Sequence, residues 1–271
     1  MLKHYKPFMP KKVNTYAEPF FGGGAMFIHI VDKCSPKELI INDINSDIIR
    51  IYKTIKTDCN SFINILDELS SDYLPLDKES RKNFYYSLRH QHAYDYSAWD
   101  STREAATLYF LMKTGFNGIY QVNKNTNDRY GTPSGLLNQK DKVYDKDVVE
   151  WWHKALQNTM ILSGDWKDCC SYVKDKNDNF VFLDPPYRGS FTSYGQEFTD
   201  DDQLSLIEYV AQNEYTKVFL CNRDTGDDFY EKNLSNLLID KFPVTYTAGR
   251  RKKTDEGFEA KPATEVLIRN K

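Results

Sequence analysis

The sequence lacks the features of membrane and secreted proteins. A transmembrane helix needs roughly 20 consecutive apolar residues, and the longest apolar runs, such as Ala25–Val31, are far shorter. The first residues, Met-Leu-Lys-His-Tyr-Lys, include no apolar leader segment. We therefore expect no membrane association and a cytoplasmic location, in a bacterium or in the cytosol of a cell infected by a phage or virus.

Cysteine is scarce and shows no metal-binding pattern. The five cysteines (Cys34, Cys59, Cys169, Cys170 and Cys221) have no CxxC spacing and no neighbouring histidine cluster. An odd number of scattered cysteines is typical of reduced core thiols in a cytosolic protein. We expect neither a zinc site nor any other bound metal.

The chain also has no excess of basic residues. Its 36 Lys and Arg are outnumbered by 39 Asp and Glu, which gives a net charge of −3. Binding to nucleic acid would therefore need basic residues gathered on one face. One such group exists near the C-terminus and comprises Arg250, Arg251, Lys252 and Lys253.

Hydrophobic periodicity predicts an α/β fold with an insertion. Segments 16–21 and 39–42 have the character of short buried strands, and between them lie three glycines and a helical run over 25–31. This order is typical of the first half of a nucleotide-binding fold. Helices are predicted at 61–69, 78–89 and 103–114, followed by a polar, looped region over 115–145.

Strand and helix signals alternate again in the last part of the chain. Strands are predicted at 159–163, 180–183 and 217–222, helices at 200–211 and 227–236, and an antiparallel hairpin from 244–246 and 264–269. Strands 39–42 and 180–183 lie too far apart for one crossover connection, so the piece between them should be a second domain. The predicted division is 1–58 and 159–271 for the core, with 59–158 inserted.

The motif Asp184-Pro185-Pro186-Tyr187 directly follows the apolar stretch 180–183. Two prolines stiffen the turn, at a strand end of the kind where α/β folds bind ligands. The Asp184 carboxylate and the Pro185 carbonyl can accept hydrogen bonds from an amine, and Tyr187 can stack on a base removed from its helix. The motif indicates chemistry at the amine of a base. The alternative is a plain strand-ending turn with a buried tyrosine.

A glycine-rich segment, Glu18-Pro19-Phe20-Phe21-Gly22-Gly23-Gly24, can let the backbone approach a ligand closely. It lacks the GxxxxGK[ST] pattern, which disfavours a phosphate-binding loop for ATP. Asp43 follows about twenty residues later, where an acid commonly binds ribose hydroxyls, although it could equally cap a helix. Asp165 could accept a hydrogen bond from the adenine of a cofactor or could cap a turn.

The order of these motifs resembles that of the Dam-type (class alpha, or D12) DNA adenine N6-methyltransferases. Similar stretches are Lys113–Asn123, Phe198-Thr199 before an acidic helix start, and Thr264–Ile268. The resemblance implies a Rossmann-like sheet with helices on both faces, a mainly helical target-recognition insertion, S-adenosylmethionine as cofactor and double-stranded DNA as partner. It also implies that the base is flipped out and methylated directly, with no covalent enzyme intermediate.

The resemblance assigns roles to individual residues. Catalysis is expected at Asp184, Pro185, Pro186 and Tyr187. Cofactor binding is expected at Glu18, Pro19, Phe20, Gly22, Gly23, Gly24, Asp43, Asp165 and Asp184. DNA contacts are expected at Asn117, Tyr120, Gln121 and Asn123, in or at the end of the similar stretch. The charge of Lys124, Arg129, Arg250, Arg251 and Lys252, and not the resemblance, predicts further DNA contacts at these residues.

Two departures from the family pattern matter. Relatives usually carry a Gly-Gly-Lys segment that touches the cofactor, and this sequence has none. This favours, as an alternative function, a weakened or inactive DNA-binding relative. Many relatives have Arg where this chain has Gln121. Arg suits guanine and Gln suits adenine, so a GATC target does not follow, and Gln121 could also be a solvated hairpin residue.

Other methyl acceptors fit the motif less well. Cytosine N4-methyltransferases tend to have Ser in place of Asp184, and glutamine methyltransferases have Asn-Pro-Pro-Tyr. Methylation of adenine in RNA is possible, but the expected recognition domain favours duplex DNA.

Overall fold

The computed structural model describes residues 2–189, 198–233, 236–246, 252–254, 257–259 and 261–270. The chain forms two compact units. Unit 1 contains the residues up to Ile44 and those from Leu162 onward, and unit 2 contains Asn45–Ile161. Each unit has its own elements and is considered by itself below.

The main sheet has seven strands in the order β5-β2-β1-β6-β7-β11-β8. β1 is parallel to both β2 and β6, and β6 is parallel to β7, whereas β11 is antiparallel to β7 and β8. This confirms the predicted α/β class and the predicted antiparallel end of the sheet. The strands are β1 (Thr15–Glu18), β2 (Glu38–Asp43), β5 (Thr159–Ser163), β6 (Phe180–Leu183), β7 (Lys217–Arg223), β8 (Leu238–Tyr246) and β11 (Lys261–Arg269).

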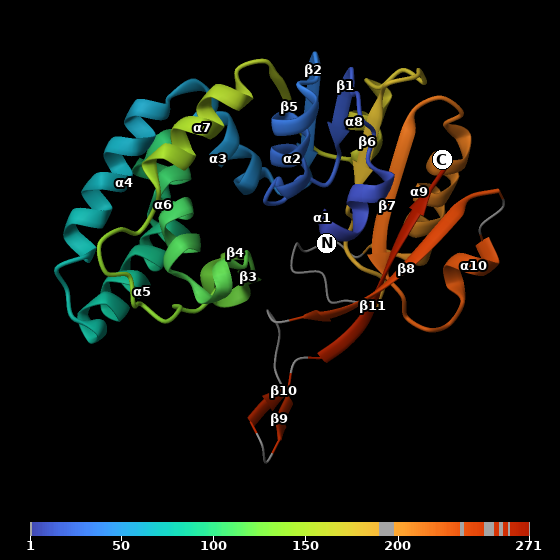
Figure 1. Cartoon of the computed structure of the whole chain (residues 1–271). Helices are drawn as coiled ribbons and strands as arrows, with labels where there is room; N and C mark the ends of the chain where they lie inside the picture. Colours follow the sequence, from blue (N-terminus) through green and yellow to red (C-terminus); the bar gives the residue numbers. More distant parts are fainter. Residues whose placement is uncertain are drawn as a thin grey trace. The chain divides into compact units, whose positions relative to one another are not determined.

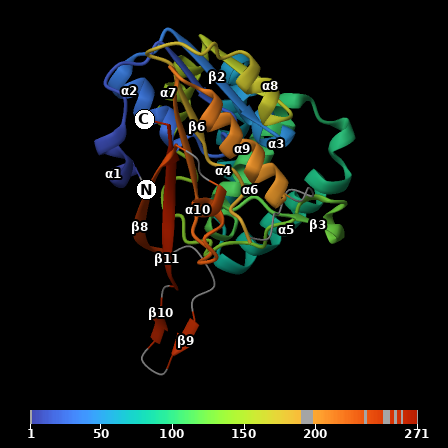
Figure 2. The same cartoon turned by 90° about the vertical axis from the view of Figure 1, so that its right-hand side faces the viewer.

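Helices cover both faces of the sheet in unit 1, as predicted. Figure 1 shows these elements face-on, and Figure 2 shows α1 and α2 on one side of the sheet with α8 and α9 on the other. The described helices of this unit are α1 (Leu2–Tyr5), η1 (Lys6–Phe8), α2 (Ala25–Cys34), α8 (Trp166–Ser171), α9 (Asp200–Gln212) and α10 (Phe229–Asn233).

Alternation along β6 explains how one strand serves two hydrophobic layers. Successive side chains of a strand point to opposite faces. Phe180 and Phe182 contact aromatic rings, and the ring centroids of Phe180 and Tyr16 are 5.7 Å apart. Val181 and Leu183 instead join the aliphatic cluster that includes Leu206 of α9. A continuous apolar run is what a strand buried on both faces requires.

The sequence predictions differ from the structure in a few elements. β1 ends at Glu18 rather than at residue 21, because Pro19 has no N–H with which to continue a sheet ladder. The predicted helix 227–236 begins at Phe229 and is described as far as Asn233. Helices α8 and α7 (Lys146–Leu156) were not predicted. The five cysteines are unpaired in the structure; Cys59, Cys169, Cys170 and Cys221 are buried, whereas Cys34, which was expected in the core, is only half-buried.

Unit 2 is built mainly from helices, with one short hairpin. Its elements are α3 (Ser46–Thr57), α4 (Cys59–Tyr73), α5 (Lys78–Tyr94), η2 (Tyr96–Ala98), α6 (Ser101–Thr114), η3 (Phe116–Gly118), β3 (Val122–Asn123), η4 (Lys124–Thr126), β4 (Arg129–Tyr130) and α7. Asp77 and Asp100 cap α5 and α6 with their side chains, as short polar residues commonly do. The compact unit 2 begins at Asn45 and therefore includes α3. The predicted functional insertion over 59–158 is a different kind of division and stays a prediction.

Two leucines on α9 allow a matched test of the core. Leu206 is fully buried in the aliphatic cluster, whereas Leu204 is 36% exposed. Leu206→Ala should lower the free energy of unfolding by about 2–5 kcal/mol because it removes buried methyl groups and leaves a cavity. Leu204→Ala should cost less than about 1 kcal/mol. Urea unfolding followed by circular dichroism measures both, and equal losses would contradict the assigned packing.

Candidate active site

The two most informative motifs leave neighbouring strands at the same edge of the sheet. β1 lies between β2 and β6. The next strand in the chain, β2, is therefore on one side of β1, and the later strand β6 is on its other side. Ala17 pairs with Val181 in parallel register, so the segments after Glu18 and after Leu183 emerge side by side. Such a switch in strand order opens a crevice in which α/β proteins bind ligands.

The glycine segment forms a tight turn before α2. Gly22 and Gly24 have φ of 47° and 65°, a region that glycine adopts without steric cost. Gly22 and Gly23 are exposed, and a Cβ atom at either would have no neighbour within 4 Å. The Gly22 N–H donates a 2.8 Å hydrogen bond to Asp43 Oδ2. The turn therefore presents exposed backbone with space in front of it.

Asn42 ties the segment before this turn to the loop that follows β5. Its Nδ2 donates to the carbonyls of Pro19 and Gly164 at 3.0 and 2.9 Å. Asn42 is buried, and a buried amide that ties two loops holds their relative positions. Asp165, next along the chain, is exposed and caps α8 by accepting a hydrogen bond from Lys167 N.

Three aromatic residues lie close to the glycine turn. Phe20 is half-buried, and its ring stacks near Trp166 with centroids 6.3 Å apart. Phe198 meets the Phe20 ring edge-on at 5.8 Å. These rings provide an apolar surface beside a polar turn, an arrangement common in cofactor sites.

A buried amide pair clamps the proline turn. Gln203 Nε2 donates to the Pro186 carbonyl at 3.0 Å, and Asn222 Nδ2 donates to Gln203 Oε1 at 3.1 Å. Asn222 Oδ1 in turn accepts from Arg188 N at 3.0 Å. Gln203 and Asn222 are both fully buried. Fully satisfied buried amides rigidify their surroundings, so the turn is held on the side of α9 and β7.

Arg188 extends this anchoring past the motif. It forms ion pairs with Asp200, at 2.6 Å, and with Asp227. Its guanidinium carbon also lies 4.0 Å from the centre of the Phe229 ring. Together with the clamp, these contacts fix both ends of the Pro186–Arg188 segment.

Three carboxyl groups lie in or beside the site. Glu18 and Glu265 are buried, whereas Asp184 reaches solvent. Burial raises the pKa of Glu18 well above its usual value, and a 2.7 Å hydrogen bond from Tyr16 partly offsets that rise. Although Asp184 is accessible, the protein around it limits hydration, and this desolvation, followed by the charge of Glu265, raises the pKa of Asp184 to about 7. Such perturbed carboxylates are typical of functional sites.

In unit 2, the predicted DNA-binding residues form two groups. Four are exposed near the hairpin, namely Asn117, Gln121, Asn123 and Lys124. The Asn123 side chain caps η4 by accepting from Asn125 N at 2.8 Å. The remaining two, Tyr120 and Arg129, are less accessible and have partners within the unit.

Arg129 belongs to a largely buried ion cluster. It pairs with Glu104, and its guanidinium carbon lies 3.6 Å from the centre of the Tyr96 ring. Glu104 also pairs with Arg50 at 2.9 Å. These side chains are mostly shielded from solvent, so the geometry favours a role for Arg129 in anchoring the hairpin. Its predicted contact with DNA is untested.

Tyr120 is tied to the same cluster. Its hydroxyl donates a 2.7 Å hydrogen bond to Asp47, which also pairs with Arg50 at 3.0 Å. Burial, followed by the charge of Asp47, raises the pKa of Tyr120 above its usual range.

The predicted C-terminal basic group is only partly described. Arg250 and Arg251 lie outside the described residues. Lys252 and Lys253 belong to β9 (Lys252–Thr254), whose backbone pairs antiparallel with β10 (Gly257–Glu259).

Comparison with known proteins identifies the family. The profile of the D12 class of N6 adenine-specific DNA methyltransferases matches residues 1–247. The chain belongs to this family.

Individual relatives match over nearly their whole length. The type II methyltransferase M.MjaIII of Methanocaldococcus jannaschii is 34% identical over 267 residues, covering 95% of this chain and 89% of its own. The type II methyltransferase M1.LlaDCHI of Lactococcus lactis is 29% identical over 280 residues, covering 100% and 91%. A DNA adenine methylase of Vibrio cholerae is 26% identical over 256 residues, covering 90% and 86%.

Membership makes the chain an adenine-specific DNA methyltransferase, with S-adenosylmethionine as the implied methyl donor and DNA as the substrate. Among the described residues, no cluster of His, Cys, Asp and Glu is arranged to hold a metal ion. None of the helices within the described ranges is long and apolar enough to cross a membrane.

Sequence reasoning assigned no role to several polar residues of this D12 site. Asn42, Gln203, Asn222 and Glu265 are buried and lie in or beside the motifs. Asn222 and Glu265 sit next to apolar strand runs, Val218–Cys221 and Val266–Ile268. A polar residue at the end of an apolar strand run could have indicated a buried polar side chain, and such a side chain needs a hydrogen-bond partner.

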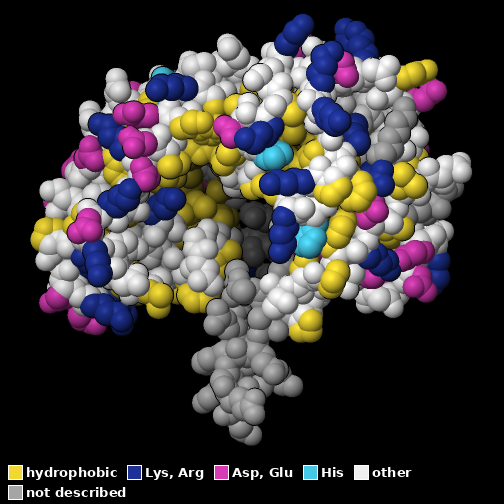
Figure 3. Space-filling model, in the orientation of Figure 1, with side chains coloured by type: hydrophobic (Ala, Val, Ile, Leu, Met, Phe, Trp, Pro, Cys, Tyr) yellow, Lys and Arg dark blue, Asp and Glu magenta, His cyan; other side chains and the backbone are white. Residues whose placement is uncertain are grey.

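A basic surface on unit 1 was also not predicted. Figure 3 shows Lys, Arg and His side chains gathered over α1 and α2. Lys6 and Lys33 lie close enough to His29 that, after burial, their charges lower its pKa. Lys33 also lies 3.6 Å from Asp32, so the surface carries both signs of charge.

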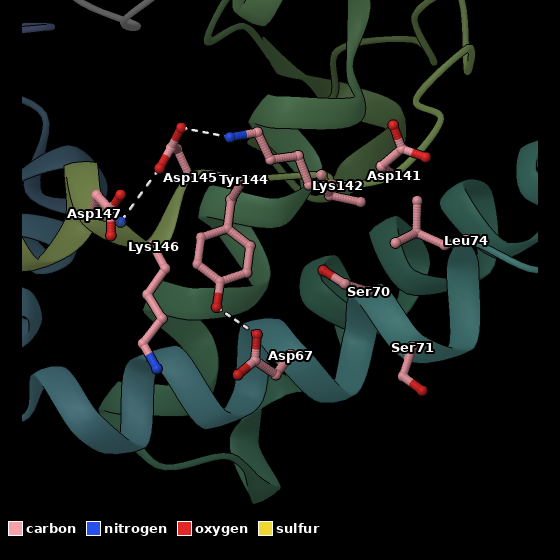
Figure 4. Close-up of a pocket in the computed structure, with 11 residues that line it drawn as sticks. Asp67, Ser70, Ser71, Leu74, Asp141, Lys142, Tyr144, Asp145, Lys146 and Asp147 are labelled. Atoms are coloured by element: carbon pink, nitrogen blue, oxygen red, sulfur yellow. Dashed lines mark hydrogen bonds and ion pairs between the residues drawn. The ribbon is translucent and has the colours of Figure 1, made fainter.

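Unit 2 has a pocket of about 460 Å³ between α4 and residues 141–147. Figure 4 shows Tyr144 pointing toward Asp67, to which its hydroxyl donates a 2.5 Å hydrogen bond, and Lys142 paired with Asp145. None of the predicted site residues lines it.

The ion cluster of unit 2 predicts different behaviour for two basic residues of one hairpin. Arg129→Met should lower the free energy of unfolding by about 1–3 kcal/mol, because Glu104 loses a charged partner in a poorly hydrated place. Amide exchange in β3 and β4 should accelerate. Lys124→Met, at an exposed position of the same hairpin, should change neither the free energy of unfolding nor amide exchange. Hydrogen exchange with mass spectrometry measures both variants, and unchanged protection in Arg129→Met would refute the anchoring role.

Proposed function

We propose that the chain binds S-adenosylmethionine at the edge formed by β1 and β2, and that the Asp184-Pro185-Pro186-Tyr187 turn presents the N6 amine of a flipped adenine to it. The observation that carries the proposal is the parallel register of β1 with β6, which puts the glycine turn and the proline turn side by side. The substrate we propose is double-stranded DNA, in the cytosol of a prokaryotic or virus-infected cell.

The residues around the glycine turn fit this cofactor. The open space at Gly22 and Gly23 admits a ligand against the backbone, and Asp43 lies where an acid binds ribose hydroxyls. Phe20 offers an apolar surface for an adenine ring. Bound S-adenosylmethionine supplies an electrophilic methyl group on a positively charged sulfur, and the ionised form of Asp184 favours a cation nearby. Pro19, Gly24 and Asp165 complete the proposed cofactor set.

Asp184 and Pro185 have the proposed role of orienting the reacting amine. The Asp184 carboxylate and the Pro185 carbonyl accept hydrogen bonds from the two N6 hydrogens, which draws electron density toward nitrogen. N6 would receive the methyl group from the donor, which would keep the former sulfur–carbon bonding pair, and the proton released from N6 would pass by way of the hydrogen-bonded Asp184 carboxylate to water. Tyr187 stacks on the flipped base. Most of the rate gain comes from holding the two reactants in line, which the stiff, clamped turn makes possible.

DNA contacts are proposed on exposed residues of unit 2 and on the C-terminal basic group. Asn117, Gln121 and Asn123 are proposed to read base edges, and Gln121 suits adenine by its paired donor and acceptor. Tyr120 is proposed to fill the gap left by the flipped base. Lys124, Arg129, Arg250, Arg251 and Lys252 are proposed to bind phosphates, which would make binding strongly salt-dependent.

The central test removes the amine acceptor. Asp184→Ala should lower methyl transfer to N6 at least about 10²-fold, because the amine loses its charged hydrogen-bond partner. Affinity for S-adenosylmethionine should change less than about threefold. Radiolabelled methyl transfer and isothermal calorimetry measure the two quantities. Asp201→Ala, an exposed residue of α9, is the matched control and should retain activity.

The outcomes separate the competing interpretations. Turnover retained in Asp184→Ala would refute the assigned chemistry. A wild-type chain that gives no calorimetric signal with S-adenosylmethionine, yet binds DNA, would favour the inactive DNA-binding relative. Long-read sequencing of DNA from cells expressing the protein would report the methylated base and its sequence together.

The raised pKa of Asp184 predicts a pH dependence. The proposed acceptor is the carboxylate, and its pKa is raised to about 7, so activity should fall as pH falls through neutrality. Below the apparent pKa, kcat/KM should drop about tenfold per pH unit. A bound sulfonium favours the carboxylate, so the corresponding acid limb of kcat should lie at lower pH. Stopped-time assays from about pH 5.5 to about pH 8.5 measure it, and a flat profile would contradict the role of an ionised Asp184.

A further inference from the structure

Glu265 is a fully buried carboxylate that no step of the proposed reaction uses. It lies on β11, where it pairs with Arg223 of β7 on one side and with Phe242 of β8 on the other. Removing a carboxylate from water is costly unless nearby donors compensate. One donor is the hydroxyl of Tyr187, which lies 3.2 and 3.0 Å from the two carboxylate oxygens of Glu265.

We propose that Glu265 is a positioning residue of the active site, which holds the ring of Tyr187 in its stacking orientation and maintains negative charge beside Asp184. This inference rests on the function proposed above, in which Tyr187 stacks on the flipped base. It assigns Glu265 no contact with substrate.

The ring of Tyr187 is held at both ends. At the backbone, the preceding prolines and the hydrogen bond from Gln203 to Pro186 fix the turn. At the far end, the hydroxyl is fixed by Glu265. A ring fixed at two points has one accessible orientation, so no rotational freedom is lost when a base stacks on it.

The charge of Glu265 acts on Asp184 as well. Among the described residues, the titratable groups that interact electrostatically with Asp184 come from several elements of unit 1, namely Tyr5 of α1, Tyr16 and Glu18 of β1, Cys221 of β7 and Glu265 of β11. After desolvation, Glu265 is the residue whose charge raises the pKa of Asp184. Neutralising Glu265 should therefore favour the ionised form of Asp184.

Two conservative substitutions separate the hydrogen bond from the charge. In Glu265→Gln, the amide oxygen can still accept from Tyr187, but the charge is gone. We expect the acid limb of the kcat/KM profile to move to lower pH, with the activity at about pH 6 relative to about pH 8 rising about threefold. In Tyr187→Phe the ring remains and the tether is lost. We expect kcat to fall about tenfold while the acid limb stays near its wild-type position.

The tether itself is tested with a fluorescent base. DNA with 2-aminopurine at the target position reports unstacking of the flipped base, and a loosened ring should raise its fluorescence in complexes with Tyr187→Phe and with Glu265→Leu. The double variant Tyr187→Phe/Glu265→Leu should lose no more activity than the more impaired of the two single variants, because both substitutions break the same hydrogen bond. Glu214→Gln, on an exposed residue of the same unit, is the control and should match the wild type.

The results decide between a positioning and a merely structural role. An acid limb unmoved in folded Glu265→Gln, or fully additive losses in the double variant, would overturn the inference. Circular dichroism and thermal melting establish that the variants are folded, and Tyr187→Phe tests the tether without altering β11. If Asp184→Ala is inactive while Glu265→Gln behaves like the wild type, the proposed function stands and only this inference is rejected.

Discussion

The pairing of β1 with β6 is the constraint on which the site depends. Parallel register between Ala17 and Val181 brings together two segments that are far apart in the chain. Because parallel strands end at a common edge, the glycine turn after Glu18 and the proline turn at Asp184 lie side by side. Any shift in this register would separate the proposed cofactor site from the proposed acceptor of the amine. The two faces of β6 differ, with Phe180 and Phe182 packed against aromatic rings and the intervening residues in the aliphatic cluster, and this difference disfavours a one-residue slip.

Buried polar side chains at this edge turn a strand end into a rigid surface. Gln203 and Asn222 hold the proline turn from one side, and Asn42 holds the loops around the glycine turn. The amides of Gln203 and Asn222 are hydrogen-bonded through both oxygen and nitrogen, so the free energy cost of removing them from water is offset by their partners. The Asn42 Nδ2 has two partners, whereas its Oδ1 has none among the described residues. Rigidity matters in methyl transfer because the rate gain comes mainly from alignment of the reactants.

Unit 2 uses charge for a similar purpose. The ion pairs among Arg50, Glu104 and Arg129 tie the short hairpin to helices, and the Tyr120 hydroxyl joins the same cluster through Asp47. Breaking one partner of a shielded cluster leaves the other charge poorly compensated. A two-stranded hairpin is marginally stable alone, so this cluster can hold it in place and leave its exposed residues available to a partner.

The sequence by itself determined the class of the fold and the identity of the chemical groups. Apolar runs bounded by turns predicted most strands, and the Asp184 motif with the glycine segment indicated the family that the comparisons confirm. These signals are local, since periodicity and turn chemistry act over a few residues. Short helices such as α8 escaped prediction because they present too few residues for a periodic pattern.

Only the tertiary structure decided which side chains surround the motifs. Glu265 meets Tyr187 across 78 positions of sequence, and Arg129, which its charge alone suggested for DNA, is paired with Glu104. No sequence pattern separates a free arginine from a paired one, or an idle buried glutamate from one that holds a ring. Burial and partner distance depend on how strands and helices pack, and packing is a property of the whole chain.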